Sequence, residues 1–209
     1  MSDFLAGDAG TLLPDAIDAP TDPGVLIEDW LALARRRGVP EVLAATLATA
    51  TADGVPSSRT LRLAELTADG VVFGTSASSR KGRDLAANPR ASATLYWREL
   101  ALQLRLDGPV EVLDPAGSDA LFADRPPAAR AATVVSRQDE PLDDLAELRG
   151  RAEALLADGR PIAREDDWLG YRLVPTSIEF WQGSPDRLHR RLRYERSAAG
   201  GWTLRGLQP

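Results

Sequence analysis

The segment Ser78-Ser79-Arg80-Lys81-Gly82 brings two hydroxyls, two cations and a glycine together where a strand pattern gives way to a helical one. Backbone N–H groups at the start of a helix, the helix dipole and nearby cations can together hold a phosphate. The same residue types also occur on solvated surfaces, so the segment alone leaves both interpretations open. Lys81 is the only lysine of the chain, which makes it more informative than any single arginine.

Two other polar residues lie in strand-like segments and have alternative roles. Arg59, in the alternating run 58–66, would either complete an anion pocket with the segment above or form a cross-strand salt bridge. Gln103 stands between Leu102 and Leu104 and would either bond the edge of a heterocycle or face water.

The C-terminal part holds an aromatic strand, residues 178–183, followed by a basic run, residues 187–194. Strand alternation would place Arg187, His189, Arg191 and Arg193 on one face. Four cationic or titratable groups on one face are costly unless they meet an anion or open solvent. An anionic ligand site and a solvated edge strand are therefore equal alternatives.

Composition limits the chemistry that the side chains can perform alone. The 209 residues include no cysteine and a single histidine. Disulfides, thiolate nucleophiles and multi-histidine metal centres are thus excluded, and no metal site is expected. Because the side chains offer few catalytic groups, a bound cofactor is a reasonable source of the chemistry.

Charge and hydropathy exclude further classes of protein. The 25 basic and 31 acidic residues give a net charge of −6, which argues against a general binder of nucleic acid or anionic membranes. The sequence shows no signal-peptide pattern and no apolar run of membrane length. We expect a cytoplasmic protein with one main domain.

The pattern along the chain predicts strands joined by tight turns, with helices added. Residues 1–22 predict a flexible N-terminal arm, and residues 23–209 the domain itself. Helices are expected at 23–37, 79–87, 115–124 and 142–157, and strands at 43–51, 58–66, 71–75, 91–98, 101–113, 170–174, 177–182, 187–196 and 201–207. Strands outnumber helices without strict βαβ alternation, which favours a mostly β, antiparallel barrel decorated with helices.

Several motifs, in this order and spacing, resemble the pyridoxamine 5′-phosphate oxidase family. They are Arg59-Thr60-Leu61-Arg62-Leu63, residues 79–85 with Asn88-Pro89-Arg90, Tyr96-Trp97, Ser136-Arg137-Gln138, and Glu179-Phe180-Trp181-Gln182-Gly183 with Arg187-Leu188-His189. The resemblance runs from about residue 23 to the C-terminus. It implies an FMN-binding split β-barrel, antiparallel and homodimeric, with FMN at the subunit interface.

The resemblance also implies roles for individual residues. The residues implied to bind FMN are Arg59, Leu61, Gly74, Thr75, Ser79, Arg80, Lys81, Gln103, Gln138, Trp181 and Arg191, with Gln103, Gln138, Trp181 and Arg191 reaching the flavin across the dimer. Arg187 and His189 match the family's substrate-facing pair and are the catalytic candidates.

The positions that hold the substrate phosphate in this family depart from its pattern. Ala64, Leu121 and Ala129 stand where the family has a lysine, a tyrosine and a serine, and only Arg125 is retained. Loss of one cation and two hydroxyls makes a pyridoxine phosphate substrate improbable, since each charge-assisted hydrogen bond contributes about 1.5–3 kcal/mol. The chain instead is similar to the phenazine-biosynthesis branch of flavin oxidases, whose substrates are reduced phenazine carboxylic acids.

The resemblance implies hydride transfer from a ring carbon of an aromatic carboxylic acid precursor to the flavin, with O2 as electron acceptor and H2O2 as by-product. Arg187 or Arg125 would clamp a carboxylate, and His189 would accept a proton or donate a hydrogen bond. Two alternatives remain: a pyridoxine/pyridoxamine 5′-phosphate oxidase that forms pyridoxal 5′-phosphate, and a non-catalytic split-barrel protein that binds flavin or haem.

Overall fold

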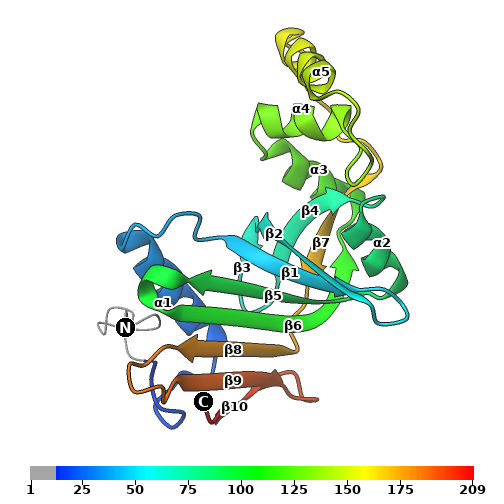
Figure 1. Cartoon of the computed structure of the whole chain (residues 1–209). Coiled ribbons are helices and arrows are strands. Elements are labelled where there is room, and N and C mark those ends of the chain that lie inside the picture. The colour runs from blue at the N-terminus through cyan, green and yellow to red at the C-terminus, as the bar shows by residue number, and fades with distance from the viewer. Residues whose placement is uncertain (1–12) are drawn as a thin grey trace.

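The structure is a computed structural model that describes residues 13–209. Its centre is one sheet in which every strand pairing is antiparallel, ordered β10-β9-β8-β6-β5-β1-β2, with β7, β4 and β3 continuing from β6 (Figure 1). The strands are β1 (Ala44–Ala50), β2 (Pro56–Arg62), β3 (Glu65–Leu66), β4 (Val71–Ser76), β5 (Arg90–Trp97), β6 (Leu102–Val112), β7 (Trp168–Leu173), β8 (Ser177–Gln182), β9 (Arg190–Arg196) and β10 (Trp202–Gly206). This arrangement is the predicted split barrel.

The helices cover the sheet and extend from it. They are α1 (Pro23–Arg36), α2 (Arg80–Ala87), α3 (Pro115–Ala123), α4 (Pro127–Val135) and α5 (Leu145–Ala157), with one 3₁₀ turn, η1 (Arg98–Leu100). Helices α4 and α5 lie beyond α3, on the side of the molecule away from β8, β9 and β10 (Figure 1). No helix within residues 13–209 is long and apolar enough to cross a membrane.

Strand β6 joins two parts of the sheet, the run β10-β9-β8-β6-β5-β1-β2 and the run β7-β4-β3. Its first half, residues 102–107, pairs with β5 and β8, and its last residues, 110–112, pair with β7. Between them, a Cβ at Gly108 would come 2.0 Å from the carbonyl oxygen of Val174. The close backbone approach therefore requires glycine where the strand passes from one part to the other.

Helix α1 supplies the aromatic centre of the core. The side chain of Asp22 caps its first turn by accepting from the N–H of Gly24, and Pro23 follows at the first helical position. Trp30 then packs edge-on against Trp97 and Phe180, with ring centroids 6.2 and 5.0 Å apart. The helix is thereby fixed to β5 and β8.

One expectation about the elements is wrong, and one helix was not expected. The strand predicted for 187–196 begins only at Arg190, because Arg187 has a φ of 68°, a left-handed conformation that a strand does not accommodate. Arg187 and His189 therefore precede β9 and do not share a strand face with Arg191 and Arg193. Helix α4 was not predicted, because it is a short run of mostly small residues that begins within the pair Pro126-Pro127, and such a pair usually marks a loop.

The arm predicted for residues 1–22 lies partly outside the described residues. Of its described part, Leu13 is fully buried, and its carbonyl accepts from Nη1 of Arg190 at 2.6 Å. The hydroxyl of Tyr194 donates to the carbonyl of Pro20 at 2.8 Å. Residues 13–20 thus contact β9.

Candidate functional site

The Ser78–Gly82 segment forms the start of helix α2 directly after β4. Ser79 is the helix cap, and its hydroxyl oxygen accepts from the N–H of Gly82 at 3.2 Å. A Cβ at Gly82 would come 2.4 Å from the carbonyl oxygen of Ala77, so glycine allows the helix to begin this close to the turn. Local capping chemistry thereby fixes the place of Lys81, the second residue of the helix.

A cavity of about 540 Å³ opens beside this helix start. It is bounded by β2, β4, the start of α2, helix α4 and the segment leading into β7. Its lining includes Arg59, Thr60, Leu61, Gly74, Thr75, Ser76, Lys81, Arg125, Ala129, Ala132, Thr133, Ser136, Arg137, Gln138, Glu165, Asp167 and Trp168. Of the site residues predicted from the sequence, the cavity brings together Arg59, Leu61, Gly74, Thr75, Lys81, Arg125, Ala129 and Gln138. Gln138 differs from its expectation: it was predicted to reach the flavin across the dimer, but it lines the cavity of its own chain, where its Oε1 accepts from Oγ1 of Thr75 at 3.2 Å.

Arg59 and Lys81, here called the cation pair, supply positive charge to this cavity. The Lys81 amine lies 3.1 Å from Oγ1 of Thr75 and 3.3 Å from Oγ of Ser79, and the side chain is only 5% exposed. Burial lowers the pKa of Lys81, and the charge of Arg59 lowers it further, whereas Asp139 opposes the shift. Within residues 13–209 neither cation forms an ion pair with a carboxylate.

This donor set fits a phosphate group. Two cations and buried hydroxyls stand at a helix N-terminus, where an anion is stabilised. In the structure the backbone N–H of Arg80 donates to the carboxylate of Asp139 at 2.6 Å, so an anionic group already lies at this helix start. A phosphate monoester such as that of FMN matches the same chemistry.

Arg125 lies in another part of the cavity wall. Its guanidinium carbon is 5.1 Å from the ring centroid of Trp168, and its Nη1 donates to Oγ1 of Thr133 at 2.8 Å. Burial lowers the pKa of Arg125 from its usual value, and none of the described carboxylates pairs with it. A half-buried guanidinium of this kind is suited to binding a carboxylate in two-pronged geometry.

The remaining residues named for the flavin or the substrate do not line this cavity. Ser79 and Arg80 lie next to it on α2. Ala64 follows β2 and is exposed, and Leu121 packs on α3, 3.1 Å from the position of a Cβ at Gly170. Gln103, Trp181, Arg187, His189 and Arg191 gather elsewhere, along β6, β8, β9 and the loop between β8 and β9.

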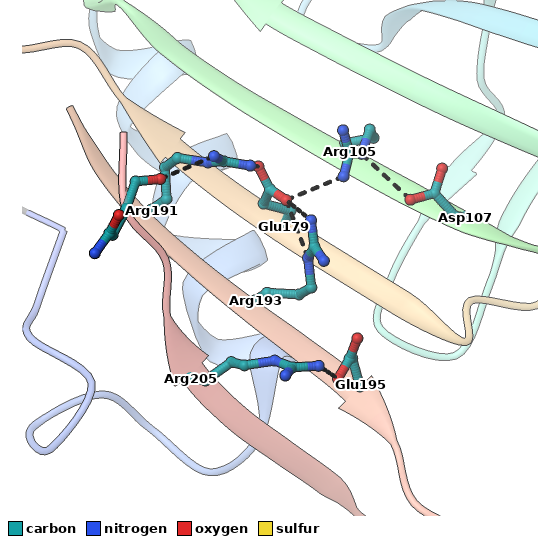
Figure 2. A network of polar contacts seen from close by, with 8 residues as sticks. Arg105, Asp107, Glu179, Arg191, Arg193, Glu195 and Arg205 are labelled. Carbon is teal, nitrogen blue, oxygen red and sulfur yellow. Dashed lines mark hydrogen bonds and ion pairs between the residues drawn. The ribbon is translucent and has the colours of Figure 1, made fainter.

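The outer face of these three strands carries a buried carboxylate. Glu179 is 3% exposed and is held by Arg105, Arg191 and Arg193, and these four residues are called the Glu179 cluster (Figure 2). Arg191 donates to Oε1 from Nε and Nη2 at 3.0 and 2.8 Å, and Arg193 donates to Oε2 at 3.1 and 2.7 Å. The anion that these arginines meet in the chain is therefore one of its own side chains.

The Glu179 carboxylate favours its ionised form despite its burial. Burial opposes the charged form, but hydrogen bonds from Arg193 and Arg191 and the charge of Arg105 together lower the pKa of Glu179 below its usual value. Arg105 also pairs with Asp107 at 3.2 Å, so three guanidinium groups meet two carboxylates and a net positive charge remains on these residues (Figure 2).

His189 lies in the loop before β9, beside the aromatic strand. Its ring centroid is 4.9 Å from that of Trp181, and its Nδ1 accepts from the backbone N–H of Ser184 at 3.1 Å. Because Nδ1 is an acceptor, the neutral ring carries its proton on Nε2. Arg187, two residues earlier, is exposed.

Sequence reasoning missed several residues that shape the cavity. Trp168, Thr133 and Asp167 line it, although none was named as a site residue. The missed helix α4 explains Thr133, whereas Trp168 and Asp167 reach the cavity only through the pairing of β7 with β4. No group of described side chains is arranged to hold a metal ion.

Family models match two long parts of the chain. The model described as pyridoxamine 5′-phosphate oxidase matches residues 34–157, and the model described as pyridoxine 5′-phosphate oxidase C-terminal dimerisation region matches residues 168–209. The chain belongs to the pyridoxamine 5′-phosphate oxidase family. In this family member the dimerisation region includes β8 and β9, and with them three members of the Glu179 cluster.

Relatives of this pyridoxamine 5′-phosphate oxidase family member fall into two activities. Dihydrophenazinedicarboxylate synthase of Pseudomonas chlororaphis is 41% identical over 209 residues, covering 100% of this chain and 94% of the relative. Pyridoxine/pyridoxamine 5′-phosphate oxidase of Burkholderia cenocepacia (strain HI2424) is 43% identical over 200 residues, covering 93% and 92%. The sequence identity to the two relatives is nearly the same and does not indicate which activity this chain has. The residues of the cavity therefore have to distinguish the two activities.

A solved structure in the family has nearly the same fold. The crystal structure of PhzG from Burkholderia lata 383, in complex with tetrahydrophenazine-1-carboxylic acid, superposes with a TM-score of 0.91 at 41% identity. The match covers 97% of this chain and 100% of that chain. The predicted fold class is therefore confirmed, and the chain is an oxidoreductase of this family.

Proposed function

We propose that this chain is an FMN-dependent oxidase that dehydrogenates a reduced phenazine carboxylic acid. The observation that carries the proposal is the composition of the cavity. It combines the cation pair, suited to one phosphate, with Arg125, which lies beside Trp168 and small apolar residues. The remaining arginine of the lining, Arg137, is paired with Glu165 at 3.0 Å. One phosphate and one aromatic carboxylate would satisfy these groups.

FMN would be held by residues from two sides. Its phosphate would meet Arg59, Lys81, Ser79 and Arg80, and its ring would lie along Leu61, Gly74, Thr75 and Gln138. When bound, FMN would supply the two-electron acceptor for the substrate, and dioxygen would then take up two electrons and two protons to become hydrogen peroxide.

The second half of the site would come from the partner copy in a homodimer. Gln103, Trp181 and Arg191 belong to the family's flavin set but do not line this chain's own cavity. Two separate groups of site residues on one chain are what a shared interface site requires. The match of residues 168–209 to a dimerisation region supports the same proposal.

The side chains near the substrate would bind and orient it. Arg125 and Arg187 would each be able to clamp a carboxylate, and His189 would present its Nε2 proton as a hydrogen-bond donor. A donor at Nε2 favours the role of positioning over that of proton acceptor while the ring stays neutral.

The pyridoxine/pyridoxamine 5′-phosphate oxidase activity is the second candidate, supported by the Burkholderia cenocepacia relative. Ala129 argues against it, since this position of the cavity wall provides no hydroxyl to a second phosphate. Ala64 and Leu121, which do not line the cavity, provide neither the cation nor the other hydroxyl that the resemblance leads one to expect. A non-catalytic protein that binds flavin or haem is the third.

The purified protein distinguishes these candidates. We expect a yellow dimer with an oxidised-flavin spectrum, and formation of peroxide and phenazine absorbance from a reduced phenazine carboxylic acid under air. Turnover of pyridoxine 5′-phosphate with no acceleration of phenazine formation would replace the first candidate by the second. A haem Soret band, or inertness toward both substrates, would favour the third.

A further inference from the structure

Asp84 is a buried carboxylate outside the cavity lining. It lies on α2, one turn after Lys81, and is 5% exposed. Its Oδ2 accepts from Oγ1 of Thr49 at 2.6 Å and from Oγ of Ser57 at 3.0 Å. No arginine or lysine among residues 13–209 forms a direct ion pair with it.

The same two hydroxyls accept hydrogen bonds from Arg59. Its Nη1 donates to Thr49 at 2.8 Å, and its Nη2 donates to Ser57 at 2.6 Å. A hydroxyl has one proton to give, so a hydroxyl that donates to Asp84 turns a lone pair toward Arg59. The two arms of the guanidinium therefore end on two hydroxyls that converge on one carboxylate oxygen.

This arrangement keeps the charge of Arg59 available. A carboxylate bonded directly to the guanidinium would compete with an incoming phosphate for the same N–H groups. Two neutral hydroxyls between them fix the orientation of Arg59 and place the negative charge one hydroxyl farther away. Three N–H groups of Arg59 are used within the described residues, which leaves Nε–H and one hydrogen on Nη2 for a ligand.

The electrostatics agree with an ionised Asp84. Burial opposes its charge, but the hydrogen bonds from Thr49 and Ser57 and the charges of Arg80 and Arg59 lower its pKa below the usual value. Burial also lowers the pKa of Arg59, and the charge of Asp84 counters that effect.

We propose that Asp84 is a positioning residue for phosphate recognition: through Thr49 and Ser57 it holds Arg59 toward the cavity without touching the ligand itself. The inference rests on the proposed FMN site. It assigns to Asp84 a role that concerns the phosphate end of the cofactor and not its ring.

The decisive measurement compares two flavins that differ only in the phosphate. FMN and riboflavin are titrated into the apoprotein and binding is followed by flavin fluorescence. For Asp84→Asn we expect the Kd for FMN to rise about tenfold or more, as for loss of one charge-assisted contact, while the Kd for riboflavin stays within about twofold of wild type. Asp69→Asn removes the same charge from an exposed turn, where the side chain is 84% exposed, and should change neither value.

A second pair of variants tests the path through the hydroxyls. Ser57→Ala should weaken FMN binding in the same phosphate-selective way, whereas Ser57→Thr, which keeps a hydroxyl, should restore most of the affinity. Ser57→Ala should add little in the Asp84→Asn background, because both changes interrupt one connection. If Asp84→Asn does not fold, as judged by circular dichroism, the Ser57 pair decides the question.

Equal weakening of FMN and riboflavin would show a merely structural role and overturn the proposal, as would an unchanged Kd for FMN. Failure of the wild-type apoprotein to bind FMN would instead refute the proposed function on which this inference rests.

Discussion

The indole of Trp168 occupies the space beside Gly74 where any other residue would place its Cβ. That Cβ would lie 2.1 Å from Cζ2 and 2.3 Å from Cη2 of the ring. The two residues lie diagonally across paired strands near the cavity, since Gly74 of β4 is opposite Gly170 of β7, and Trp168 of β7 is opposite Ser76 of β4. The absence of a side chain at position 74 thus sets where the aromatic wall of the cavity stands.

Gly74→Ala should therefore displace Trp168 and destabilise the fold by about 1–3 kcal/mol, the usual cost of overpacking. Urea unfolding measures the free energy, and the near-ultraviolet circular dichroism of the indole reports the displacement. Gly150→Ala is the matched control: nothing lies within 4 Å of a Cβ at this position in α5, and we expect a gain of up to about 1 kcal/mol from helix propensity. Equal stabilities of the two variants would contradict the packing argument.

Glu179→Gln should destabilise the protein strongly, because it leaves Arg105, Arg191 and Arg193 gathered around a neutral amide. Breaking a buried charge network costs about 3–5 kcal/mol. Glu195→Gln, which breaks only an exposed pair with Arg205, should cost at most about 1 kcal/mol in the same unfolding assay. A loss for Glu179→Gln no larger than that of the control would mean that the cluster contributes little to stability.

Tyr194 should make the protein sensitive to alkali. It is fully buried, and burial with the nearby charge of Asp22 raises its pKa to about 12. The raised pKa means that the folded state favours the neutral phenol. The contribution of this neutral phenol to the free energy of unfolding is complete below a pH of about 10, the pKa in the unfolded chain, and is lost as the pH rises from about 10 to 12. Unfolding free energies measured across that range should fall by roughly 2 kcal/mol more than those of Tyr194→Phe.

Arg125→Lys should raise the KM for a reduced phenazine carboxylic acid by about tenfold, with a smaller change in kcat. Lysine keeps the charge but loses the planar fork, the second prong toward a carboxylate and the stacking on Trp168. Steady-state kinetics under air provide both constants. An unchanged KM would show that Arg125 does not bind the carboxylate, and Arg187 would then be tested in the same way.

Features governed by neighbouring residues were predictable from the sequence. The helix start at Ser79 and the turn before β4 follow from capping and turn chemistry, and the structure has both. Lys81 therefore reaches the cavity from the predicted segment.

Features that depend on distant pairings were not predictable in the same way. Trp168 reaches Gly74 only because β7 pairs with β4, and Asp84 reaches Arg59 only through side chains of β1 and β2. The strand predicted from alternation was also wrong for residues 187–189, because alternation assumes an extended backbone that Arg187 does not have. The sequence did not determine which anion pairs with Arg191 and Arg193, because Glu179 lies in another strand.

The burial of Lys81, the one lysine of the chain, has a practical consequence. Because the chain contains one lysine and this side chain is buried at the cavity wall, isotopic enrichment of lysine alone gives a single ammonium resonance from a known place. Magnetic resonance of that one nucleus would register the arrival of a phosphorylated molecule without any introduced dye or tag.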